Sequence, residues 1–160
     1  ERSFPEFLNN YIPHDPGIIE DENGSEMGEH KGLAFYTLGQ RQGLGIGGLR
    51  HAKNDPWYVA KKNLEKNTLV VVQGNNHPLL MSSQLETANL KLVNELDEKR
   101  FNGKAKVRYR QEDQDCFIEI LDQTLKVKFK EQQRAVTPGQ SVVIYKNDVC
   151  LGGGEINNIH

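Results

Sequence analysis

The chain has 160 residues, of which 20 are Lys or Arg and 22 are Asp or Glu, so its formal net charge is −2. This balance excludes a globally basic nucleic-acid binder but leaves room for a local basic face. Hydrophobic residues make up 36% of the chain, which indicates one folded domain or two small ones rather than a disordered segment. The apolar runs are far shorter than the roughly 18 residues that a membrane span needs.

The first predicted element is a short helix over residues 3–11. Ser3 and Glu6 have the spacing of a capping box. The apolar side chains recur with helical spacing at Phe4, Phe7, Leu8 and Tyr11. Pro13 then ends the helix.

Almost everything after this helix is predicted to be strand and turn. Residues 18–28 predict a hairpin with Asn23-Gly24 at its turn. Further strands are expected over residues 33–38, 57–60, 69–73, 83–93, 103–111, 115–121, 124–129, 141–145 and 148–156. Such short spacing without intervening helices predicts a mainly β protein built from small barrels or sandwiches. The turn-forming residues 74–78 predict a boundary between a first domain, residues 1–76, and a second, residues 77–160.

The segment around Gly43, Gly45 and Gly48 satisfies the pattern G-x-G-x-x-G. That pattern binds a pyrophosphate where a helix N-terminus follows it. Residues 49–56 are instead polar, contain a proline and lead into a strand, which disfavours a dinucleotide site. Two interpretations stay open: a loop in which backbone packs closely against backbone, or a loop that lies against RNA or another domain through Arg41.

Basic residues alternate with apolar ones in two predicted strands. Lys104, Lys106, Arg108 and Arg110 would share one strand face, and Lys126, Lys128 and Lys130 would share another. Residues on one face lie about 6.6 Å apart, which is comparable to the phosphate spacing of an extended nucleic-acid strand. A solvated sheet face is the alternative, and it is favoured for the second stripe.

The cluster Arg108-Tyr109-Arg110-Gln111 is the stronger candidate for an RNA or phosphate contact. Arginine binds phosphate oxygens in a bidentate way, and tyrosine stacks or donates a hydrogen bond. In a regular strand, however, Tyr109 would point away from Arg108, towards the core. Farther along, residues 137–140 have the form of a type II turn that would present Gln140 at a barrel rim.

No catalytic or metal-binding constellation is evident in the sequence. The five histidines are scattered without ligand spacing. Cys116 and Cys150 lie in apolar strand patterns, which predicts buried side chains rather than nucleophiles, and reduced thiols in a cytoplasmic protein. Pro5 and Glu6 interrupt the first apolar segment, so no signal peptide is expected. Because the chain begins with Glu1 rather than Met, we expect a fragment of a longer protein.

Several strings, taken together and in order, resemble one family. They are Gly28-Glu29-His30, residues 36–41 running on to 43–48, Pro56-Trp57-Tyr58-Val59, Gln73-Gly74, His77-Pro78, Arg108-Tyr109-Arg110-Gln111, residues 135–141 and residues 149–154. The chain resembles the central and C-terminal portion of the bacterial tRNA-specific 2-thiouridylases, the MnmA family.

The resemblance implies a PRC-barrel-like central domain and a C-terminal barrel similar to those of translation factors. It further implies contacts with tRNA at Arg108, Tyr109 and Gln140. The pattern of basic and polar residues adds Lys106, Arg110 and Gln111 as further candidates for RNA contact. The family makes 2-thiouridine at the wobble position, using ATP with Mg and a persulfide sulfur donor protein. Its ATP loop and catalytic cysteines belong to an N-terminal part that has no match here, so we expect no catalytic residue, no cofactor and no activity in this chain alone.

Two other functional classes remain as alternatives. The chain could be a β-barrel docking module for a sulfur-relay partner that makes no direct contact with RNA. A nucleotide-binding enzyme that uses the glycine-rich segment is the weaker of the two, for the reason given above.

Overall fold

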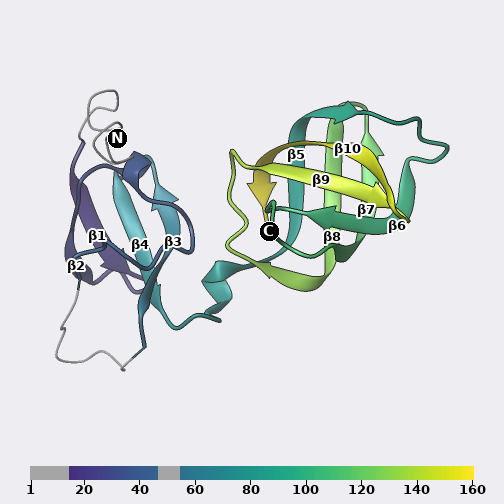
Figure 1. Ribbon diagram of the computed structural model, residues 1–160. Coiled ribbons are helices and arrows are strands. Elements are labelled where there is room, and N and C mark those ends of the chain that lie inside the picture. Colours follow the sequence, from purple (N-terminus) through teal and green to yellow (C-terminus); the bar gives the residue numbers. More distant parts are fainter. Residues whose placement is uncertain (1–14, 47–54) are drawn as a thin grey trace, which may run out of the picture. The chain divides into compact units, whose positions relative to one another are not determined.

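The computed structural model describes residues 15–46 and 55–160 and is drawn in Figure 1. Over these ranges the chain forms ten strands and two short 3-10 helices: β1 (Gly17–Asp21), β2 (Glu26–His30), η1 (Leu33–Phe35), β3 (Trp57–Asn63), β4 (Thr68–Gln73), η2 (Pro78–Leu80), β5 (Met81–Leu92), β6 (Arg100–Lys106), β7 (Gln114–Leu121), β8 (Thr124–Arg134), β9 (Ser141–Lys146) and β10 (Val149–Ile159). The mainly β fold is confirmed. The chain divides into two compact units, Glu1–Leu80 and Met81–His160. The helix predicted over residues 3–11 lies outside the described residues.

In the first unit, the described strands form one sheet in the order β2-β1-β4-β3. β1 and β2 pair antiparallel, and Gly24 in their turn has a φ of 83°, so the predicted Asn-Gly hairpin is confirmed. The backbone N–H groups of Asn23 and Ser25 both donate to Asp21 Oδ1, at 2.9 and 2.8 Å. On its other side β1 pairs in parallel with β4, so the hairpin is joined to a strand about fifty residues further along.

Residues 33–38 do not form the predicted strand. They contain η1, in which the N–H of Tyr36 donates to the carbonyl of Leu33 at 3.3 Å. The flanking Gly32 and Gly39 have φ values of 132° and 78°, which interrupt an extended backbone. Side chains from this turn and from the glycine-rich segment complete the core of the first unit, which comprises Ile19, Tyr36, Leu44, Ile46, Val59, Leu69 and Val71.

His30 links the end of β2 to the turn before β4. Its side chain is 1% exposed. Its Nδ1 accepts from the N–H of Gly32, and its Nε2 donates to the carbonyl of Asn67, both at 3.0 Å. The neutral ring with its proton on Nε2 satisfies both backbone groups at once, so His30 is a structural residue.

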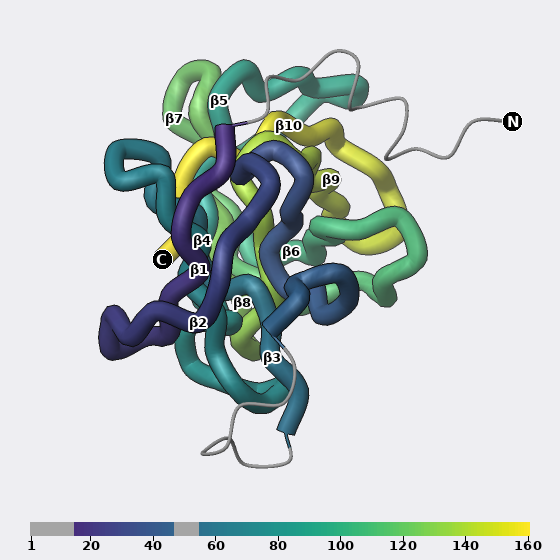
Figure 2. Tube along the Cα trace, turned by 90° about the vertical axis from the view of Figure 1, so that its left-hand side faces the viewer, coloured from purple at the N-terminus to yellow at the C-terminus, as the bar shows by residue number. Residues whose placement is uncertain are grey.

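Residues 81–160, all of which the structure describes, form a closed barrel with the strand order β10-β5-β8-β7-β6-β9. Figure 2 shows the chain path through these strands. Inward and outward side chains alternate as predicted: Phe101 and Ala105 of β6 are buried, whereas Lys104 and Lys106 lie on the outer face. The barrel core comprises Leu85, Phe101, Ala105, Val107, Cys116, Ile118, Ile120, Leu125, Val127, Phe129, Val136, Val142, Ile144, Leu151 and Ile156.

Two barrel strands end five residues away from their predicted ends. β8 continues to Arg134 instead of ending at Phe129, and β6 ends at Lys106 instead of Gln111. The alternation of Lys104 to Arg110 therefore describes a strand only in its first half. The second half forms the loop between β6 and β7.

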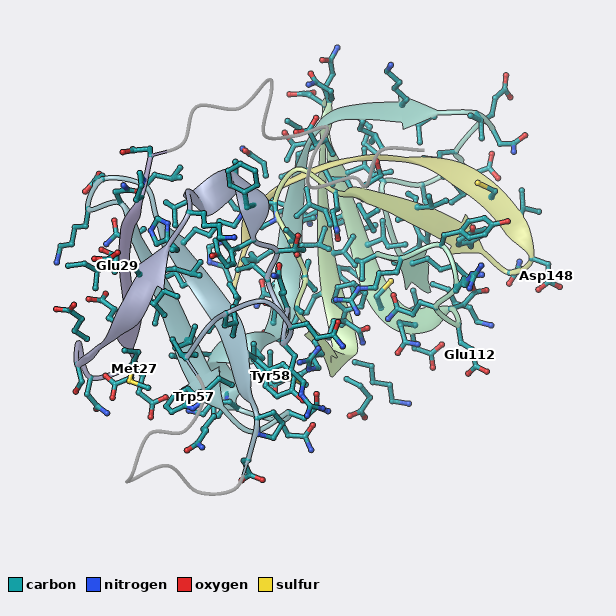
Figure 3. All side chains as sticks on the ribbon, turned by 60° about the vertical axis from the view of Figure 1, so that its left-hand side comes forward. Met27, Glu29, Trp57, Tyr58, Glu112 and Asp148 are labelled. Carbon is teal, nitrogen blue, oxygen red and sulfur yellow. The ribbon has the colours of Figure 1, made fainter. Side chains whose placement is uncertain are left out.

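We expect His30→Ala to lower the free energy of unfolding of the first unit by about 1–3 kcal/mol, because two backbone groups lose a buried partner. Trp57, the single tryptophan, lies in β3 of this unit, so its fluorescence in a urea titration reports the transition. Glu29→Ala is the matched control, since Glu29 is the exposed neighbour of His30 on β2 (Figure 3). Equal midpoints for the two variants would show that the buried imidazole contributes nothing.

Candidate nucleic-acid interface

The loop between β6 and β7 is held in shape by Gln111. Its Oε1 accepts from the N–H of Val107 at 3.2 Å, and its Nε2 donates to Oε1 of Gln133 at 2.6 Å. Gln133 is buried and donates in turn to Oε1 of Gln114 at 3.2 Å. The amide of Gln111 is therefore engaged within the barrel, which makes it a support of the loop rather than a free polar group at the surface.

Arg108 fastens the same loop to the segment that follows β8. One of its guanidinium nitrogens, Nη2, donates to the carbonyls of Arg134 and Ala135, at 3.3 and 3.0 Å. The residue is nevertheless exposed. Because a guanidinium has five N–H donors, these two bonds leave others for a ligand. The guanidinium is thus held in a defined orientation at the barrel surface.

Tyr109 lies at the tip of the loop and is 96% exposed. The turn is closed by a hydrogen bond from the N–H of Gln111 to the carbonyl of Arg108, at 3.2 Å. Arg108 and Tyr109 both follow the end of β6. The rule that neighbouring strand residues face opposite sides therefore does not apply to them. Tyr109 is therefore not a core residue, and its ring is free to stack.

Gln140 is presented by the turn that precedes β9. Gly139 has a φ of 85°, and the N–H of Gln140 donates to the carbonyl of Thr137 at 3.2 Å, so the predicted type II turn is confirmed. The carbonyl of Gln140 accepts from the N–H of Ile156 at 2.7 Å, which holds the turn against β10. The backbone is thus fixed while the Gln140 side chain is exposed.

A surface groove of about 550 Å³ brings the three main candidates together. Arg108 and Tyr109 line it from the β6–β7 loop, and Gln140 lines it from the turn before β9. Its floor includes Tyr145 of β9. The groove therefore combines a cation, an exposed phenol ring and an exposed amide, a set suited to a phosphate, a base face and a base edge.

The two remaining basic candidates differ in their surroundings. Lys106 forms an ion pair with Asp113 at 3.0 Å, and this hydrogen bond raises the pKa of the lysine above its usual value. Its Nζ also lies 5.8 Å from the centre of the Tyr145 ring. Arg110 is exposed. Lys106 thus helps to form the groove wall, whereas Arg110 projects from the loop.

The cysteines have the character of structural residues. Burial raises the pKa of the Cys116 thiol to about 12, with a smaller contribution from Asp115, so it stays protonated at neutral pH. Cys150 is half-buried, and neither cysteine forms a disulfide. In residues 15–46 and 55–160, no cluster of three His, Cys, Asp or Glu side chains could hold a metal ion. Over the same ranges, no helix is long and apolar enough to cross a membrane.

The described part of the glycine-rich segment contributes to packing. Leu44 and Ile46 are part of the core of the first unit. Gly43 precedes Leu44, Gly45 separates it from Ile46, and their φ values are 77° and 69°. Up to Ile46 no helix follows that could supply free N–H groups to a phosphate. The described glycines therefore provide positive φ values rather than the close backbone packing that was one interpretation, because a Cβ built at Gly45 meets nothing within 4 Å. Gly48 lies outside the described residues.

Two protein families match successive parts of the chain. Residues 5–73 match the family described as "tRNA methyl transferase PRC-barrel domain", and residues 82–156 match the one described as "Aminomethyltransferase beta-barrel domain". These matches confirm a PRC-barrel domain followed by a β-barrel domain.

Curated relatives match 98% of the chain. Proteins named "tRNA-specific 2-thiouridylase MnmA" are 53% identical in Marinobacter nauticus, 54% in Pseudomonas aeruginosa and 52% in Francisella tularensis. The matched region covers 40%, 42% and 44% of those relatives, so the chain spans about two fifths of their length. Identity at this level over nearly the whole chain means that it belongs to the MnmA family of tRNA-specific 2-thiouridylases, corresponding to their PRC-barrel and β-barrel domains.

Proposed function

We propose that this chain is the tRNA-binding portion of an enzyme that makes 2-thiouridine at the wobble position of tRNA in the cytoplasm. The observation that carries the proposal is the groove beside the β6–β7 loop, where Arg108, Tyr109 and Gln140 meet. ATP with Mg and a persulfide donor protein would bind to the N-terminal part of the full-length enzyme, which this chain does not match. The role of this portion is to hold the RNA during that chemistry.

Each of the three side chains has a distinct task in this proposal. The oriented guanidinium of Arg108 binds a phosphate through the donors that its two carbonyl bonds leave unused. The exposed ring of Tyr109 stacks on a base, an interaction that does not depend on salt. The Gln140 amide, on its rigid turn, donates to and accepts from a base edge or a ribose.

We expect the 160-residue chain to bind a tRNA transcript with an affinity that falls steeply with salt, since phosphate contacts release counterions. Tyr109→Ala should weaken binding by about 1–3 kcal/mol, the usual effect of losing a base–aromatic stack. Its melting temperature should not change, because the side chain is 96% exposed. Fluorescence anisotropy between about 50 and 200 mM salt, beside thermal melts, measures both quantities.

Two variants serve as controls for the tyrosine. Tyr109→Phe should bind as the parent does if stacking is the main contribution. Val149→Ala removes an exposed apolar side chain of the same barrel, at the start of β10, and should also bind normally. A parent chain that does not bind tRNA at low salt would refute the proposal and favour a protein-docking module.

Arg108→Ala should change stability and binding together. We expect tRNA affinity to fall by about 1–3 kcal/mol and the salt slope by about one contact. The melting temperature should also fall, since the carbonyls of Arg134 and Ala135 lose their donor. Arg110→Ala is the comparison: it should reduce the salt slope without changing the melting temperature. If Arg108→Ala lowers stability but leaves tRNA affinity intact, the residue is a loop anchor alone.

A further inference from the structure

A second groove, of about 580 Å³, lies on the outer face of β6, β7 and β8. We call it the Phe117 groove. Phe117 of β7 is 43% exposed and lies opposite Asn102 of β6 and Lys128 of β8 in the strand register. Lys104 and Lys130 also line the groove, and Asp115 is its acidic lining residue. An exposed aromatic ring thus lies among three lysines on the barrel surface.

The lysines of this face differ in their pairing. Toward one end of the strands, Lys126 forms an ion pair with Glu86 at 2.8 Å and Arg100 pairs with Glu119. Within the described residues, Lys128 and Lys130 form no such ion pair. In the part of the chain that the structure describes, the stripe of lysines therefore has an ion-pair partner at Lys126 and none at Lys128 or Lys130, although Asp115 and Glu131 line a pocket beside Lys130. Lys128 is the lysine directly opposite the exposed ring.

The Phe117 groove and the candidate tRNA-binding groove both have lining residues on β6. Lys106 lines the first groove and Lys104 lines the second, and both lie on the outer face of this strand. Two residues of a strand separate them by about 6.6 Å, close to one phosphate step of an extended nucleic-acid strand. This spacing suits an RNA path that runs from Tyr109 across β6 to Phe117.

We propose that the Phe117 groove is a second RNA-contact surface, on which a base stacks on Phe117 while Lys128 and Lys130 bind the flanking phosphates. The proposal rests on the proposed function, because it extends the tRNA path from the first groove. Stacking platforms flanked by cations are the usual means by which small barrels hold single-stranded nucleic acid. The charge of the lining favours a polyanion over an apolar protein segment.

Matched pairs of variants test the two halves of the proposal in the 160-residue chain with a tRNA transcript. Phe117→Ala is compared with Leu121→Ala, because both residues lie in β7 and are 43% and 44% exposed. Lys128→Gln is compared with Lys126→Gln, which lies two residues away but has a carboxylate partner. Thermal melts accompany every binding curve, and Phe117→Leu replaces the alanine variant if that variant melts early.

We expect Phe117→Ala to weaken binding at least about fivefold with an unchanged salt slope, since stacking releases no counterions. Lys128→Gln should weaken binding and reduce the salt slope by about one. The tRNA affinities of Leu121→Ala and Lys126→Gln should stay within about twofold of the parent's affinity, and their salt slopes should equal the parent's, because neither change removes a proposed contact.

Two results would overturn the second surface while leaving the first intact. In one, Tyr109→Ala weakens binding but Phe117→Ala and Lys128→Gln do not, which assigns this face to a protein partner or to solvent. In the other, the control variants lose as much affinity as their counterparts, which indicates a general charge or stability effect. A parent chain that fails to bind tRNA overturns both proposals.

Discussion

The hydrogen bonds that fasten the β6–β7 loop to the end of β8 determine the candidate interface. Gln111 reaches the buried Gln133, and Arg108 reaches the carbonyls of Arg134 and Ala135. Both target sites lie more than twenty residues away along the chain, and the antiparallel pairing of β7 with β8 brings the end of β8 back beside the loop. Without these bonds the loop would have no fixed path, and Tyr109 would have no fixed position relative to Gln140.

This arrangement couples the stability of the barrel to its candidate binding surface. Arg108 contributes to both, because part of its guanidinium is engaged with the backbone while the rest faces outward. Tyr109 and Arg110 sit on the loop without supporting it, so they can change without cost to the fold. Arg108 thus orients the loop, whereas Tyr109 and Arg110 are exposed on it.

Local patterns predicted much of the fold because their physical causes are local. The Asn23-Gly24 hairpin and the turn before Gln140 depend on glycine at a positive φ, which neighbouring residues reveal. The prediction failed for residues 33–38, where an apolar run forms a 3-10 turn whose side chains complete a core. It also failed at the end of β6, which stops at Lys106: the N–H of Val107 donates to the Gln111 side chain, and Arg108 bonds to the distant carbonyl of Ala135.

The sequence by itself determined the mainly β architecture, the family and the residues with the right chemistry for RNA. The tertiary structure decided which partners and surroundings each of those residues has. Lys126 and Lys128 are equivalent in the sequence pattern, yet one meets Glu86 and the other borders Phe117. Likewise Gln111 and Gln140 are both polar candidates, but the Gln111 amide is hydrogen-bonded to Gln133 whereas Gln140 lines the groove. Charge and hydrogen-bond pairing depend on which distant strands become neighbours, and barrel closure sets that register.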